Sequence, residues 1–234
     1  MVCGSFGHQS LTPHASKISI FNAIMAILAV CFGIVGCVSY TNKSSSLENA
    51  PWMQAEFQME PAKDVTVDVD YYMGIRSLMI QAEIDGLQTA TITTYKDCMN
   101  DKEEDADQRE ACDKCDSAAV GTVTMCSFAL IAAGVAFLCF IMRHSCDSAF
   151  AKDLGIVAGT ASFVFGVISY TVFLKCRNAI EDSDMEPLNK EIKWGIGAKL
   201  VLGSFVLMLL ITFINLITPV QEEEEEVNQD DSKA

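Results

Sequence analysis

The sequence predicts a bundle of four membrane-spanning helices with a small antiparallel β-sheet formed by the first loop between them. Two observations point to this fold class. Half of the 234 residues are hydrophobic although the net charge is −15, so apolar and charged residues must be segregated along the chain. The segregation produces four nearly uncharged stretches, and the first of these is followed by a long segment with the alternation of β-strands.

Each apolar stretch is about 20–25 residues long, the length that a helix needs to cross roughly 30 Å of hydrocarbon. Backbone polar groups in lipid must be hydrogen-bonded internally, so each span is expected to be helical. A single stretch could be a buried core helix, but four in so short a chain favour membrane crossings. The first is too long for a typical cleaved signal peptide and is expected to remain as an anchor. The predicted spans are residues 18–40, 118–142, 154–174 and 194–218.

The segments between the spans are very unequal in length. Four crossings place both termini on the same side of the membrane. The Lys and Arg count of the short segments slightly favours a cytoplasmic position for the third loop, residues 175–193. The remaining segments are the N-terminus 1–17, the long first loop 41–117, the short loop 143–153 and the acidic tail 219–234.

The cysteines indicate the opposite orientation. Four of them fall on the side of the first and third loops, where they can form two disulfides, and disulfides persist only in an oxidising compartment. We therefore expect these loops outside the cell or in a lumen, both termini in the cytoplasm, and the chain in the plasma membrane. Cys3 and Cys146 would be cytoplasmic thiols and possible palmitoylation sites. The disulfide candidates are Cys98, Cys112, Cys115 and Cys176.

The first loop contains the residues expected to form the sheet. The stretch "VTVDV", residues 65–69, alternates apolar and polar side chains, and "LMIQAEI", residues 78–84, places Leu78, Ile80 and Ile84 on one face. We expect this face to pack the sheet onto the helices. Asp85 and Gly86 then form the turn of a hairpin, because glycine tolerates positive φ. An isolated hairpin is marginal in water, so at least three strands are expected.

A large, sheet-forming first loop followed by a smaller second outer loop resembles the claudin superfamily in divergent form. That superfamily includes the peripheral-myelin-protein branch, the calcium-channel gamma subunits and the amastins. The stretch "YYMGIR", with Tyr72, Gly74 and Arg76, lies where the family has its loop signature. Trp194 and Gly195 resemble the family's entry into its last helix. Gly74 also interrupts the strand pattern and marks a bend or bulge.

The resemblance implies a non-enzymatic four-pass protein. It would make lateral or cell-surface contacts, or act as an auxiliary subunit of a membrane complex. The implied partners are the lipid bilayer and another membrane protein or a second copy of the chain. Cys98 is expected to pair with Cys112 or Cys115, and the remaining cysteine either pairs with Cys176 or stays free.

The alternative is a membrane thiol oxidoreductase, because Cys112-Asp-Lys-Cys115 precedes the second span. This placement is similar to that of bacterial DsbB, and vitamin K epoxide reductase also uses such a motif. Cys98 and Cys176 could supply the second pair that the electron relay needs. However, a reactive thiol needs a lowered pKa, and the neighbouring Asp113 and Asp116 act against that.

Other motifs are few. Asn42 begins the glycosylation sequon Asn-Lys-Ser directly after the first span. The acidic run 97–116 is expected to be a solvated, charge-extended loop. The sequence has no phosphate-binding glycine loop, no zinc-ligand spacing and no basic patch. We therefore expect no cofactor, no metal and no nucleic-acid partner.

Overall fold

The computed structural model describes residues 13–62, 65–84, 86–101, 105–146, 149–183 and 188–218. The chain divides into two compact units, and we describe each by itself. The helical unit comprises residues 1–31, 128–164 and 204–234, and the sheet unit comprises residues 32–127 and 165–203. Each of the four long helices contributes one section to each unit.

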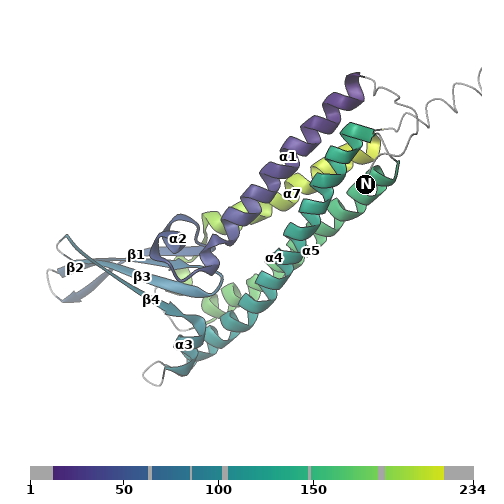
Figure 1. The fold of residues 1–234 in the computed structure, drawn as a ribbon. Helices are drawn as coiled ribbons and strands as arrows, with labels where there is room; N and C mark the ends of the chain where they lie inside the picture. Colours follow the sequence, from purple (N-terminus) through teal and green to yellow (C-terminus); the bar gives the residue numbers. More distant parts are fainter. Residues whose placement is uncertain are drawn as a thin grey trace, which may run out of the picture. The chain divides into compact units, whose positions relative to one another are not determined.

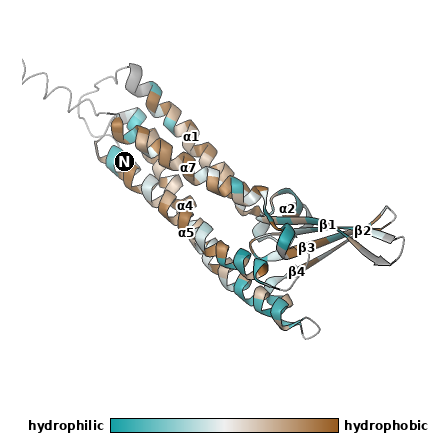
Figure 2. Cartoon of the chain, turned by 180° about the vertical axis from the view of Figure 1, so that it is seen from behind, coloured by the Kyte–Doolittle hydropathy of each residue, from teal (hydrophilic) through white to brown (hydrophobic). Residues whose placement is uncertain are grey.

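The prediction of four apolar helices with a small antiparallel sheet is confirmed. Within the described residues, four helices are long and apolar enough to cross a membrane, as expected of a multi-pass membrane protein. Many of their large apolar side chains are exposed, among them Phe21, Ile131 and Phe213, and such a surface suits lipid rather than water. Figure 2 shows apolar residues along the greater part of each helix. The helices are α1 (Pro13–Cys37), α4 (Ala106–Cys146), α5 (Ala149–Glu181) and α7 (Ile196–Ile217).

Two of the helices extend well beyond the apolar stretches that predicted them. Helix α4 begins at Ala106, so much of the acidic run 97–116 is helix rather than the expected solvated loop. An i, i+4 ion pair between Glu110 and Lys114, 2.8 Å apart, supports this polar section. Helix α5 likewise continues to Glu181, into the predicted third loop. Hydropathy measures compatibility with lipid and gives no information on where a helix ends in water.

Small residues bring the helices of the helical unit into close contact. Its buried cluster is dominated by alanines, such as Ala29 of α1 and Ala136 of α4, with Phe140 and Met208 filling the larger spaces. The hydroxyl of Ser204 on α7 donates a hydrogen bond to the Ala29 carbonyl at 2.6 Å. In lipid, helices associate through such close packing and interhelical hydrogen bonds rather than through the hydrophobic effect.

A buried arginine joins α4 to the end of α7. Arg143 is 4% exposed, and its guanidinium donates hydrogen bonds to the Asn215 side chain and, at 2.9 Å, to the Thr218 carbonyl. The last carbonyls of a helix carry partial negative charge, so they are suitable acceptors for a buried cation. Arg143 therefore belongs to α4 and to the packing of the helical unit, and not to a free connector.

The sheet unit contains a sheet with five strands among the described residues, ordered β4-β3-β2-β1-β5 (Figure 1). All neighbours are antiparallel, and Figure 1 shows α3 following β4 toward the start of α4. The sequence analysis missed β1, although Met53, Ala55 and Phe57 alternate with polar residues there. The strands are β1 (Met53–Ala62), β2 (Val65–Met73), β3 (Ser77–Ile84), β4 (Leu87–Thr94) and β5 (Lys193–Trp194).

In the part of the sheet unit that the structure describes, four short helices connect the longer elements. They are η1 (Val38–Tyr40), α2 (Ser44–Asn49), α3 (Tyr95–Asn100) and α6 (Leu188–Glu191). Helix α2 turns the chain from α1 toward β1 and buries Leu47. The predicted first loop therefore contains short helices in addition to the expected strands.

Trp52 joins the sheet to three of the long helices. It is fully buried, and its indole Nε1 donates a hydrogen bond to the Gly36 carbonyl of α1 at 2.7 Å. Its ring packs edge-on against Phe173 of α5, with centroids 4.7 Å apart. Its backbone N–H donates to the Met73 carbonyl of β2, and its carbonyl accepts from the Gly195 N–H just before α7. One residue thus fixes α1, β2, α5 and the start of α7 in the sheet unit.

Two glycines allow the backbone to approach closely around this residue. A Cβ at Gly74 would collide with the Ser39 carbonyl, and a Cβ at Gly195 would collide with the Pro51 carbonyl. Gly74 also closes the turn between β2 and β3, because its N–H donates to the Ser77 carbonyl at 2.8 Å. The expected bend at Gly74 is present. Glycine is required there because a side chain would collide with the neighbouring backbone.

Replacing Trp52 with phenylalanine is expected to lower the thermal unfolding midpoint of the purified protein. The change removes the indole donor to Gly36 and part of the packing on Phe173, and losing a buried hydrogen bond costs about 1–3 kcal/mol. Trp194→Phe is the matched control, because the ring of Trp194 is only partly buried and a phenylalanine can still stack on Tyr170. Equal midpoints for the two variants would contradict the assigned role of Trp52.

Candidate functional site

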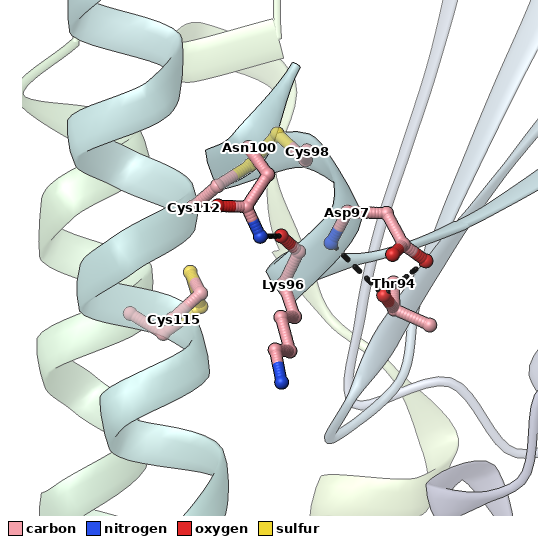
Figure 3. The surroundings of a disulfide bond; sticks show 8 residues. Thr94, Lys96, Asp97, Cys98, Asn100, Cys112 and Cys115 are labelled. Atoms are coloured by element: carbon pink, nitrogen blue, oxygen red, sulfur yellow. Dashed lines mark hydrogen bonds between the residues drawn. A yellow bond between two sulfur atoms is a disulfide. The ribbon is translucent and has the colours of Figure 1, made fainter.

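A disulfide between Cys98 and Cys112 ties α3 to the first turns of α4 (Figure 3). Both cysteines are buried, and their Cα atoms are 6.1 Å apart. Helix α3 has six residues and is too short to be stable alone. The covalent link therefore fixes the chain where it leaves the sheet and enters α4.

Helix α3 is capped at both ends by its own side chains. Thr94 is the N-cap, and its hydroxyl oxygen accepts a hydrogen bond from the Asp97 backbone N–H at 3.1 Å. At the other end the Asn100 side chain donates to the Lys96 carbonyl at 2.8 Å (Figure 3). These local bonds orient Cys98 toward α4.

A second disulfide, Cys115–Cys176, joins α4 to α5. Cys115 is 1% exposed and Cys176 is fully buried. Among the pairings that the sequence left open, the structure has Cys98 with Cys112 and Cys115 with Cys176. Both links lie in the sheet unit, on the polar extensions of the two longest helices.

The Cys112-x-x-Cys115 motif is shared between these two links. The two cysteines are not bonded to each other, and each is joined to a different element. Exchange chemistry requires a thiolate to reach a disulfide sulfur, and all four sulfurs belong to buried residues. This arrangement suits structural cross-links between α3, α4 and α5.

The residues resembling the claudin signature fall into two groups in the sheet unit. Tyr72 lies on β2, opposite Gln54 and Met79. Arg76 follows Gly74, and its guanidinium donates to the Tyr40 hydroxyl at 3.1 Å and lies 5.5 Å from the centre of that ring. This group therefore attaches the β2–β3 turn to the segment after α1.

The second group packs around Trp194. Its ring stacks on Tyr170 with centroids 4.8 Å apart, and the Arg177 guanidinium lies 4.8 Å from the ring centre. Trp194 belongs to β5 and pairs with Met53, so it precedes α7 rather than opening the fourth span as expected. It brings the start of α7 to the edge of β1.

The other singled-out residues are dispersed. Gly86 has φ of +78°, and Ile84 pairs with Leu87, as a two-residue hairpin turn requires. Asn42 is exposed after η1. Asp85 and Cys3 lie outside the described residues, and Cys146 is the last residue of α4.

Sequence reasoning missed Trp52. The claudin resemblance indicated Tyr72 as the aromatic residue of the loop signature. In the structure, Trp52 makes the contacts to the helices instead. A usable signal was present, because Trp52 is one of only two tryptophans and directly follows Pro51 at the start of an alternating segment. Large aromatic residues dominate the energetics of cores and interfaces.

A cavity of about 550 Å³ separates one face of the sheet from α4 in the sheet unit. The sheet contributes aromatic and apolar side chains, and α4 contributes its first two turns and both cysteines of the motif. Tyr95 closes one wall; burial raises the pKa of its hydroxyl, which donates to the Gly74 carbonyl at 2.9 Å. The sheet residues that line the cavity are Phe57, Met59, Tyr71, Met73, Leu78 and Ile80.

The expected packing of the sheet onto the helices is only partly present. Leu78 and Ile80 face α4 across this cavity and are half-buried. Ile84 is 44% exposed, so the expectation that it packs against the helices is wrong. It lies at the end of β3, beside the hairpin turn.

The opposite face of the sheet is acidic. Glu56 pairs with Asp70 across β1 and β2, and Asp68 pairs with Glu83 across β2 and β3. Partial burial, with the negative charges of Glu56, Asp68 and Glu83, raises the pKa of Asp70 above its usual value. Like charges on adjacent strands repel each other, so the carboxylates of this face destabilise the folded sheet.

Strand β4 forms an edge of the sheet over its whole length. Its only strand neighbour in the described part of the chain is β3, and its first five residues are all exposed. Leu87 at the hairpin tip is 71% exposed. An edge strand presents backbone N–H and C=O groups that can pair with another chain.

No family model matches the chain, and no curated protein matches its sequence.

Asp70→Asn is expected to raise the unfolding midpoint at pH 7, with a gain that shrinks as the pH falls. The raised pKa means that the folded protein holds the Asp70 proton more tightly than the unfolded chain. Well below pH 4 the Asp70 carboxyl is protonated in both the folded and the unfolded protein, so it does not lower the free energy of unfolding. As the pH rises toward and through the pKa of Asp70 in the folded protein, the repelled negative charge lowers the free energy of unfolding. The asparagine variant does not lose this stability.

The control is Asp113→Asn, which removes the same charge from an exposed position on α4. The difference between its midpoint and that of the parent protein should change little between pH 4 and pH 8. A D70N midpoint at pH 7 that equals or falls below that of the parent protein would contradict the assigned repulsion on this face.

Proposed function

We propose that this chain is a claudin-like, non-enzymatic four-pass protein of the plasma membrane whose sheet makes lateral contacts with another membrane protein or a second copy of itself. The observation that carries this proposal is the exposed edge strand β4 with its apolar hairpin tip. When a strand of a partner pairs with a sheet edge, the backbone hydrogen bonds supply affinity. Every second side chain of the strand contacts the partner and supplies specificity.

The disulfides support the orientation. Cys98–Cys112 and Cys115–Cys176 both lie in the sheet unit, and such bonds persist outside the cytosol. With four crossings, an external sheet places both termini in the cytoplasm. The strand that we assign to recognition then faces the extracellular space, next to the outer leaflet.

The register of the β3–β4 hairpin identifies which backbone groups of β4 are available. A two-residue turn makes Ile84 and Leu87 a hydrogen-bonded pair, and such pairs alternate along an antiparallel ladder. The N–H groups of Gln88, Ala90 and Ile92 therefore point away from β3. A partner strand would accept hydrogen bonds from these three residues.

Ala90→Pro tests this contact without breaking the hairpin, because proline removes a donor that points away from β3 and its ring blocks an approaching strand. A photo-crosslinker at Gln88, used in native membranes, should yield one discrete product. We expect A90P to lower its yield by at least about tenfold, since edge pairing depends on continuous hydrogen bonding. The mass of the product distinguishes a second copy from a different protein.

Ala90→Thr is the matched control, because threonine keeps the N–H donor and favours a strand. It should crosslink as well as the parent chain. The proposal fails if proline and threonine give the same yield, or if the Gln88 crosslinker produces no discrete product in the native membrane.

A further inference from the structure

The cavity between the sheet and α4 has the dimensions and lining of a small-molecule site. Its volume of about 550 Å³ lies within the range of roughly 300–1,000 Å³ typical of ligand pockets. Such pockets combine apolar and aromatic walls with a few polar groups that determine orientation. Here the walls belong to the sheet and the polar groups to the first turn of α4.

The sheet side of the cavity is lined by aromatic rings. Phe57 and Tyr71 are stacked with their centroids 5.4 Å apart, on neighbouring strands of the same sheet face. Tyr95 adds a third ring, which its hydrogen bond to Gly74 holds in place. Met59 and Met73 complete the wall with flexible, polarizable side chains that adapt to the shape of a ligand.

The charged groups at the cavity are all of one sign. Asp105 and Asp107 line it from the start of α4, with Gln108 beside them. The described residues that line the cavity include no lysine, arginine or histidine. Arg109 follows Gln108 on α4 but is not part of the lining.

Aromatic faces with carboxylates nearby recognise a particular chemistry. A quaternary or alkyl ammonium group is attracted to the negative face of an aromatic ring, and the attraction strengthens when the site excludes water. We propose that this cavity binds an organic cation, an ammonium group carried on an apolar body, with the ammonium between the aromatic wall and Asp105 and Asp107. The ligand could be a soluble amine or the choline headgroup of a membrane lipid.

The site is separate from the strand edge of the proposed lateral contact. The edge contact uses the backbone of β4, whereas the cavity is lined by side chains of β1, β2 and β3 and by the helices. Ligand binding can therefore be measured on protein in detergent, without any partner protein.

The probe is phenyltrimethylammonium, and its control is tert-butylbenzene, the uncharged molecule of the same shape. Each is titrated into the full-length protein in a maltoside detergent, with ligand-observed NMR and empty micelles as the blank. We expect saturable binding of the cation at least about tenfold tighter than that of the neutral molecule. Equal affinities would overturn the proposal, because the cavity would then be merely apolar.

Two double variants and one single variant locate the binding. Asp105→Asn with Asp107→Asn should abolish the preference for the cation, whereas Glu56→Gln with Asp68→Asn removes the same charge from the opposite face and should preserve it. Phe57→Leu keeps the cavity apolar but removes a π-face, so it should weaken the cation and leave the neutral molecule nearly unchanged. Equal losses in the two double variants, or an unchanged preference in D105N/D107N, would overturn the proposal.

A competition experiment distinguishes the two sources of the ligand. Dihexanoylphosphatidylcholine, kept below its micelle-forming concentration, displaces the probe if the site accepts a lipid headgroup. If only soluble amines displace it, the ligand is a free organic cation. Either result supports a cation site, and displacement by an uncharged amide of similar size would contradict it.

Discussion

The sheet unit depends on the burial of a single indole. Trp52 donates to the last turn of α1, packs against α5, and bonds through its backbone to β2 and to the residue before α7. A small sheet has too little core to be stable in water without support. Attaching it at one buried point to three helices supplies that support, and the glycines at 74 and 195 allow the backbone to come close enough.

The disulfides supply support of a second kind in the sheet unit. Helices α4 and α5 continue beyond their apolar sections, where lipid no longer favours helix formation. The link between Cys115 and Cys176 holds the two extensions together, and the link between Cys98 and Cys112 holds α3 against them. Trp52 and the disulfides both attach the sheet to the helices, and a cavity lies between the sheet and α4.

Sequence reasoning identified the features that depend on local periodicity. The four apolar helices, strands β2 to β4 and the turn at Gly86 follow from hydropathy, alternation and glycine chemistry. It could not choose among the cysteine pairings, because those depend on which helix faces turn toward each other. It also misplaced Ile84 and overlooked Trp52 and the cavity, since each depends on how the strands and helices pack together. The edge position of β4 likewise follows only from the strand order.

The sheet presents an open edge strand and an aromatic, acidic cavity. The proposed function places both of them outside the cytoplasm. The direct measurement is the labelling of single cysteines in intact cells with a membrane-impermeant maleimide. In a background with Cys3 and Cys146 replaced by serine, Leu87→Cys at the hairpin tip should be labelled on intact cells, and Ser145→Cys near the end of α4 only after permeabilisation. The reverse pattern would place the strands and the disulfides in the cytosol and contradict the account.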